Sequence, residues 1–87
     1  NKILALNKEL ESFKTQNILI ENIVTDYTKM LHAEERKLSF GESSLFLINS
    51  REKSLIDSKL KAIEIQNKYL VAKAQLFNSL SQDLKKL

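Results

Sequence analysis

The sequence has few of the residues that make turns and covalent cross-links. Its 87 residues include one glycine, no proline and no cysteine, whereas average usage would supply roughly six glycines and four prolines. Sandwiches, barrels and α/β folds need many turns and are therefore disfavoured. The lack of cysteine excludes a disulfide framework and a thiolate metal site. We expect helix with a single interruption, in one small domain or a piece of a larger protein.

Long apolar runs and a strong charge excess are missing as well. The longest apolar run, residues 45–48, is far too short to span a bilayer, and no segment has the pattern of a signal peptide. The net charge is +3. Basic residues such as Arg51, Lys53, Lys59 and Lys61 alternate with acidic ones, which is typical of a solvated helix face and not of a nucleic-acid surface. We read the chain as an excised segment and expect any targeting signal to lie outside it.

The first half carries a strict seven-residue repeat. With the first isoleucine at position a, nine of eleven a and d positions are apolar over five heptads, which predicts a coiled-coil helix. The exceptions are Asn17 and Glu34. Gly41 follows the last position by three residues, where a helix needs a left-handed residue in order to stop, and Ser43 and Ser44 are candidate N-caps for a second helix. The eleven positions are Ile3, Leu6, Leu10, Phe13, Asn17, Ile20, Val24, Tyr27, Leu31, Glu34 and Leu38.

The second half carries two apolar stripes at heptad spacing. The first is apolar at seven of its nine positions, which are Ile56, Leu60, Ile63, Asn67, Leu70, Ala74, Phe77, Ser81 and Leu84. The second lies one residue earlier in each heptad and consists of Ile48, Leu55, Ala62, Tyr69 and Leu76. Two adjacent stripes predict a wide apolar face that contacts two neighbours.

These patterns predict an all-α fold, a long antiparallel two-helix coiled-coil hairpin. The helices are expected over about residues 2–40 and 44–86, with a turn at 40–44, and each is roughly 60 Å long. Asn17 lies 24 residues before Gly41 and Asn67 lies 26 after it, so the two should lie at nearly the same height. One buried polar residue per helix could fix the register of the hairpin. The alternative is two unrelated asparagines at partly exposed positions.

Nothing in the sequence indicates catalysis. A two-helix hairpin offers no concave pocket in which reactive groups converge. The single histidine, His32, is expected on the helix surface. Glu34 and Glu35 point roughly 100° apart and do not form a carboxylate pair for one substrate. We therefore expect no catalytic residue, no cofactor and no metal site.

The turn is the feature that a purely structural reading does not explain. Leu38 and Phe40 lead into Gly41, and the apolar run 45–48 follows directly. A hairpin tip is exposed to solvent, so large apolar residues beside it indicate a binding partner. The alternative is that they pack on neighbouring helices of a larger bundle.

Residues 33–52 (AEERKLSFGESSLFLINSRE) and 68–74 (KYLVAKA) resemble the TolC-like outer membrane efflux proteins. In that family a helix ends in an apolar–x–apolar–Gly–x–Ser/Thr–Ser/Thr–Leu signature, and a stretch rich in tyrosine and alanine follows some 25 residues later. The resemblance covers residues 33 to about 84. Residues 1–32 agree with the family only in their heptad character.

The resemblance implies a segment of a larger α-barrel. Family members are homotrimers in which an outer-membrane β-barrel continues as an α-helical tunnel across the periplasm. The turns of the hairpins form the tip of the tunnel, which docks a periplasmic adaptor protein of a tripartite pump. This chain would lie in the periplasm and meet the membrane only through parts of the protein outside it. The tip residues that would contact the adaptor are Leu38, Phe40, Gly41, Glu42, Ser43, Ser44 and Leu45.

One family feature does not carry over. Some members place aspartates just past the turn, where they narrow the tunnel entrance by charge. This chain has Leu47, Asn49 and Ser50 in that region, so a carboxylate ring is not expected. Two other readings stay open: the helical hairpin of the adaptor protein itself, and a cytoplasmic coiled-coil scaffold without a transport role.

Overall fold

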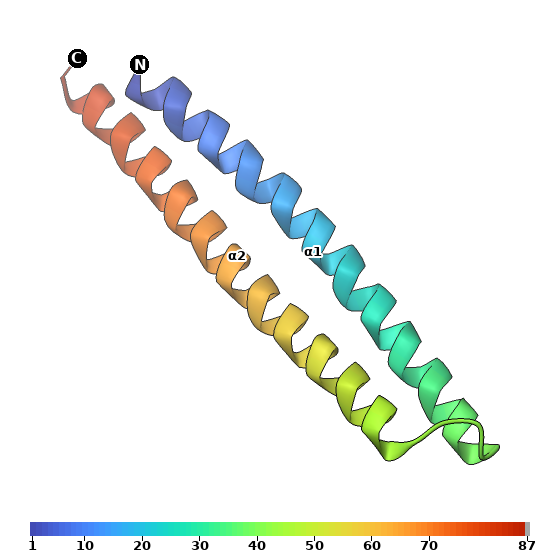
Figure 1. Cartoon of the computed structure of the whole chain (residues 1–87). Coiled ribbons are helices and arrows are strands. Elements are labelled where there is room, and N and C mark those ends of the chain that lie inside the picture. Colours follow the sequence, from blue (N-terminus) through green and yellow to red (C-terminus); the bar gives the residue numbers. More distant parts are fainter. Residues whose placement is uncertain (87) are drawn as a thin grey trace.

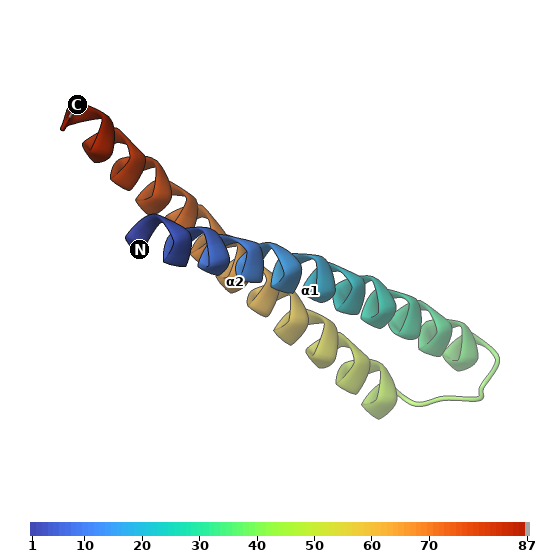
Figure 2. The ribbon, with the colours of Figure 1, turned by 90° about the horizontal axis from the view of Figure 1, so that it is seen from above.

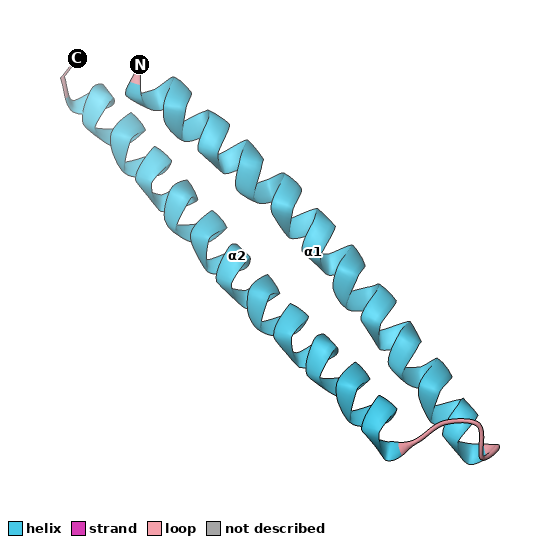
Figure 3. Cartoon of the chain, in the orientation of Figure 1, coloured by secondary structure: helices cyan, strands magenta, loops and turns pink. Residues whose placement is uncertain are grey.

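The chain folds as two long antiparallel helices joined by a short turn (Figure 1). The computed structural model describes residues 1–86, in which α1 spans Lys2–Ser39 and α2 spans Leu45–Lys85. The hairpin measures 70 × 14 × 14 Å, and a loop interrupts the helices at one end only (Figure 3). Seen from above, the helices cross at a shallow angle (Figure 2), as helices with heptad repeats do. The predicted antiparallel hairpin is confirmed.

Side-chain and backbone caps define the ends of α1. Asn1 begins the helix, because its Oδ1 accepts hydrogen bonds from the backbone N–H groups of Ile3 at 2.8 Å and Leu4 at 3.4 Å. At the other end the N–H of Gly41 donates to the carbonyl of Leu38 at 3.0 Å, and the N–H of Glu42 donates to that of Lys37 at 2.8 Å. This pair of bonds is a Schellman motif, which requires a left-handed residue at the glycine position.

The glycine and one serine act at the turn as the sequence predicts. Gly41 has a φ of 74°, the conformation that ends α1. Of the two candidate N-caps, Ser44 caps α2: its Oγ accepts a hydrogen bond from the N–H of Leu47 at 3.3 Å. The apolar run 45–48 is therefore the first turn of a helix.

All eleven predicted a and d positions of α1 face α2. Each is buried or half-buried, including the two polar exceptions, Asn17 and Glu34. The repeat carries nine of the large apolar residues of this helix on one face, whereas the others, Leu4, Ile18, Leu19, Ile23 and Met30, are exposed. The orientation of α1 in the hairpin therefore follows from its sequence.

The face of α2 that packs on α1, which we call the seam of α2, contains the second predicted stripe and five further residues. These ten positions are all buried or half-buried. Half of them are apolar residues of that stripe, and most of the others are small or polar. The seam of α2 consists of Ile48, Arg51, Leu55, Ser58, Ala62, Ile65, Tyr69, Ala72, Leu76 and Ser79.

The first predicted stripe of α2 lies outside the seam. Its apolar members are exposed, with Ile63 at 55%, Leu70 at 53% and Phe77 at 72% of full accessibility. At 100° per residue, the middle of this stripe lies roughly 150° around the helix from the middle of the seam. The expectation of one wide apolar face was therefore wrong, because α2 has two apolar faces on nearly opposite sides. We call the first stripe, from Ile56 to Leu84, the outer stripe.

Of the two readings of the asparagines, the structure supports the second: they do not form a buried pair. Asn17 is half-buried on the face of α1 that packs on α2, but Asn67 is exposed on the outer stripe between Ile63 and Leu70. The register places the two residues at about the same height, as expected, but Asn67 faces away from α1. Asn67 therefore does not set the register of the hairpin.

Two isoleucines two positions apart give a direct test of this orientation. Ile65 lies in the seam and is 6% exposed, whereas Ile63 lies on the outer stripe and is 55% exposed. We expect Ile65→Ala to lower the free energy of unfolding by about 2–4 kcal/mol and the matched control Ile63→Ala to change it by no more than about 0.5 kcal/mol. Urea denaturation followed by circular dichroism measures both. Equal losses in the two variants would contradict the orientation of α2.

Candidate functional site

The turn and the first residues of α2 form an apolar end of the hairpin, which we call the tip (residues 38–47). Phe40 is 78% exposed, Leu45 69% and Phe46 78%. The backbone turns between these side chains at Gly41, which is itself exposed. Three large apolar side chains are therefore displayed to solvent around one tight turn.

The other predicted tip residues differ in how far they are exposed to a partner. Glu42 is exposed, and Ser44 is exposed while it caps α2. Leu38 is half-buried as the last seam residue of α1, and Ser43 is half-buried because its side chain turns inward. The surface that a partner can reach therefore consists mainly of Phe40, Gly41 and Glu42 with the first turn of α2.

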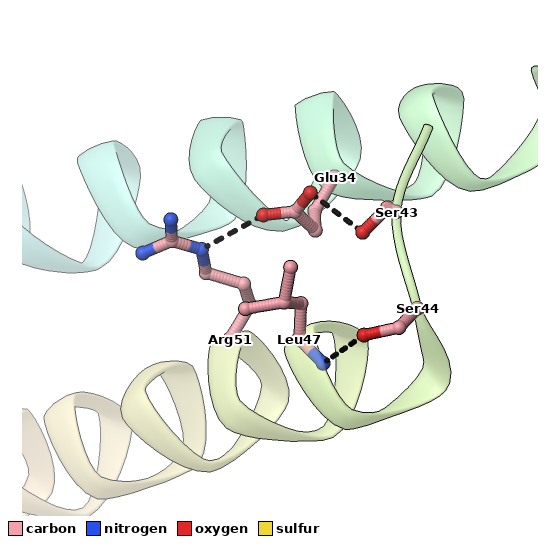
Figure 4. Close-up of polar contacts among 5 residues, drawn as sticks. All are labelled: Glu34, Ser43, Ser44, Leu47 and Arg51. Carbon is pink, nitrogen blue, oxygen red and sulfur yellow. Dashed lines mark hydrogen bonds and ion pairs between the residues drawn. The ribbon is translucent and has the colours of Figure 1, made fainter. Parts of the chain in front are cut away.

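A buried carboxylate lies directly beneath the tip (Figure 4). Glu34 of α1 is only 5% exposed. Its Oε2 accepts a hydrogen bond from the Oγ of Ser43 in the turn at 2.7 Å. Its Oε1 accepts a hydrogen bond from the Nε of Arg51 in α2, and the two groups form an ion pair at 3.4 Å. One side chain of α1 thus joins the turn and the second helix.

These contacts favour the ionised form of Glu34. The hydrogen bond from Ser43 contributes most to holding the pKa of this carboxyl below its usual value of 4.5. Burial opposes the shift, because it disfavours a charge. The hydrogen bond from Arg51 and the charges of Lys37 and Arg51 lower the pKa further. At neutral pH the site therefore holds a carboxylate with a partner at each oxygen.

Sequence reasoning missed two members of this cluster. The prediction that Arg51 lies on a solvated face was wrong, since Arg51 is half-buried in the seam of α2. Ser43 was predicted only as a helix cap or a surface residue. Glu34 itself could have indicated the cluster, because an acidic residue in a mostly apolar repeat needs a partner. Arg51 lies about as far after the turn as Glu34 lies before it.

Acid should therefore destabilise the hairpin through Glu34. A carboxyl whose pKa is lowered on folding contributes stability above its unfolded value, and this contribution is lost as the pH falls through the folded value. We expect the midpoint of thermal unfolding to fall more steeply in the wild type than in Glu34→Gln below about pH 4.5. Glu64, whose pKa is lowered chiefly by a hydrogen bond from Lys68, titrates in both proteins and cancels in the comparison. Parallel profiles for the two proteins would contradict the role of Glu34.

Other candidate groups are dispersed over the surface. His32 and Glu35 are exposed on α1 and stand apart from the cluster. Within residues 1–86, no three His, Cys, Asp or Glu side chains are grouped so that they could hold a metal ion. Neither helix, as far as it is described, is long and apolar enough to cross a membrane.

Comparison with protein-family models, with curated proteins and with solved structures finds no match to this chain. The placement of its own residues, together with the sequence pattern at the turn, therefore carries the inference of function.

Proposed function

We propose that this chain is a non-catalytic segment of a TolC-like outer membrane channel for efflux or secretion. It forms part of the periplasmic tunnel wall, and its tip docks a periplasmic adaptor protein. The full-length protein is a homotrimer that meets the outer membrane through parts outside this chain. The segment binds no nucleic acid and no cofactor.

One observation carries this proposal: apolar side chains lack partners in the two places where a tunnel segment needs them. At the tip, Phe40, Leu45 and Phe46 are exposed around Gly41. Along α2, the outer stripe is exposed on nearly the opposite side from α1. A helix in a closed wall has one neighbour on each side, and this arrangement of apolar faces suits that position.

The amount of exposed surface supports a segment that packs on neighbours. The hairpin exposes 6703 Å², whereas a compact monomer of 10.0 kDa exposes about 5,200 Å². The excess, about 1,500 Å², is larger than the roughly 800 Å² that one partner contributes to a standard interface.

A photo-crosslinking experiment in the full-length protein tests the docking role. A crosslinking amino acid at Phe40 or Phe46 is expected to form a covalent product with the purified periplasmic adaptor. The same amino acid at Asn22, exposed in the middle of α1, should form none. Products of equal yield at all three positions, or none at the tip, would reject the docking role.

The resemblance leaves two alternatives, which differ in what surrounds the hairpin. In a periplasmic adaptor protein, Gly-rich strands of a lipoyl-like domain would flank the hairpin on both sides. In a cytoplasmic coiled-coil scaffold, further heptads would precede it. A TolC-like channel instead requires strands of about ten residues with alternating polarity in the same polypeptide. The adjoining coding sequence distinguishes the three.

A further inference from the structure

We propose that Glu34, Ser43 and Arg51, which we call the polar anchor, hold the turn in the shape that presents the tip, so that loss of the Glu34 carboxylate frees the turn without unfolding the hairpin. The part of this proposal that concerns a docking partner rests on the proposed function. The part that concerns the turn does not.

The anchor is the one polar side-chain connection between separate segments in residues 1–86. Every other side-chain hydrogen bond or ion pair in that part of the chain joins residues no more than four positions apart. Glu34, in contrast, reaches nine positions to Ser43 and seventeen to Arg51. It therefore fixes the turn to α1 and α1 to α2 at the height of the tip.

The carboxylate occupies a position where an apolar residue would serve the seam better. Glu34 lies in the same repeat as Leu31 and Leu38. Replacing a buried ion pair by a hydrophobic residue of similar size is often neutral or stabilising, so a buried carboxylate is weak support for a role in overall stability. The hydrogen bond that it accepts from Ser43 instead acts on the turn, where it is the one side-chain bond that reaches back to α1; the turn's other bonds are short-range ones, namely the backbone bonds at the end of α1 and the Ser44 cap of α2.

The surroundings of the carboxylate make the anchor responsive to pH. The charged groups that act on it are Lys37 of α1 and Arg51 of α2, both basic, while the turn contributes the uncharged Ser43. Protonation removes the charge that both basic groups and the Ser43 hydroxyl favour. Acid should therefore loosen the turn before it unfolds the helices.

A leucine at position 34 separates the two roles, because it completes the apolar seam and removes the anchor. In Glu34→Leu we expect a midpoint of thermal unfolding equal to or above that of the wild type. We also expect the amide protons of Gly41 and Glu42 to lose about tenfold of their protection from exchange at pH 7, the effect of losing one hydrogen bond of ordinary strength. Solvent-exchange NMR of the 87-residue chain measures protection residue by residue.

Two further variants keep the test decisive. Ser43→Ala removes only the hydroxyl and should loosen the turn to a similar degree, even if Glu34→Leu repacks the seam. Glu35→Gln removes a neighbouring exposed carboxylate and should leave protection unchanged. In the wild type, protection of the turn should decline with falling pH along the titration of Glu34 itself, followed by carbon-13 NMR. Unchanged protection in both Glu34→Leu and Ser43→Ala would overturn the proposal.

Adaptor binding distinguishes a failed anchor from a failed docking site. If the anchor presents the tip for docking, Glu34→Leu should weaken binding of the purified adaptor to the full-length protein about tenfold or more while the trimer stays intact. A loosened turn with unchanged binding would support the anchor and count against the docking role of the tip. A turn that stays ordered while binding weakens would overturn the anchor.

Discussion

Valine in place of Gly41 is expected to lower the midpoint of thermal unfolding by about 4–16 °C and to abolish docking at the tip. The residue has a φ of 74°, which costs an L-residue with a side chain roughly 1–2 kcal/mol, and more for a β-branched one. In a domain of this size, each kcal/mol shifts the midpoint by about 4–8 °C. The new backbone conformation would also redirect the chain between Phe40 and Leu45.

The cause of this effect is conformational and not steric, so matched substitutions can isolate it. A Cβ at position 41 would meet no other atom within 4 Å. Gly41→Asn should therefore stay close to the wild type, because asparagine tolerates the left-handed region. A D-alanine at the same position, introduced by chemical synthesis, should match or exceed wild-type stability, since a positive φ is its preferred conformation.

Calorimetry of the isolated chain and an export assay of the full-length protein together measure both consequences. If Gly41→Val keeps the wild-type midpoint, the turn does not need a left-handed residue. If the midpoint falls but export is unchanged, the turn requires glycine, but the tip is not where the channel meets its adaptor.

Both helices could be predicted from the sequence, but only for α1 could the buried face be predicted as well. The difference has a physical reason. In α1 one heptad repeat carries most of the large apolar residues, and the apolar residues outside it do not form a second heptad stripe, so one orientation is favoured. In α2 two heptad patterns overlap, and the bulkier one, with Leu60, Phe77 and Leu84, faces outward. The seam of α2, which packs on α1, also contains Ser58 and Ser79, and no apolar pattern identifies these two residues.

Side-chain size explains why α1 packs on the seam of α2 and not on the outer stripe. Phe13 and Ala72 line one groove between the helices, and Val24 and Ala62 line another. At these two places a larger residue of α1 lies beside an alanine of α2, which lets the helices approach closely there. The bulky outer stripe would hold α1 farther away. Such complementarity depends on both helices at once, so it cannot be found by reading each one separately.

The tip and its anchor were predictable to different extents. A single glycine after five heptads located the turn, and the neighbouring sequence located the exposed apolar residues. The polar anchor depends on the rotation of α2, which places Arg51 in the seam and leaves Asn67 outside it. This rotation gives Glu34 its partners and, of the two readings of the asparagines, leaves the unpaired one.

Two carboxylates on the outer stripe are expected to prevent assembly while leaving the hairpin folded. Leu70 is 53% exposed and Phe77 72% exposed in the hairpin, so replacing both by glutamate should change the unfolding free energy of the isolated chain by no more than about 0.5 kcal/mol each. In an assembled wall, burial of the surface that each side chain still exposes contributes about 1–2 kcal/mol. Losing both should weaken association at least about 30-fold, and burying two charges would weaken it further.

The sides of α2 supply a control with the same change of charge. Gln66 and Gln75 are exposed beside the seam and outside the outer stripe. Replacing both by glutamate should leave the trimer of the full-length protein intact in native mass spectrometry, whereas Leu70→Glu with Phe77→Glu should yield monomers. Circular dichroism of the isolated chain should show the same helical content in both. A trimer that survives glutamates at Leu70 and Phe77 would mean that nothing packs on the outer stripe, and α2 would then have a single neighbour, which a closed tunnel wall does not allow.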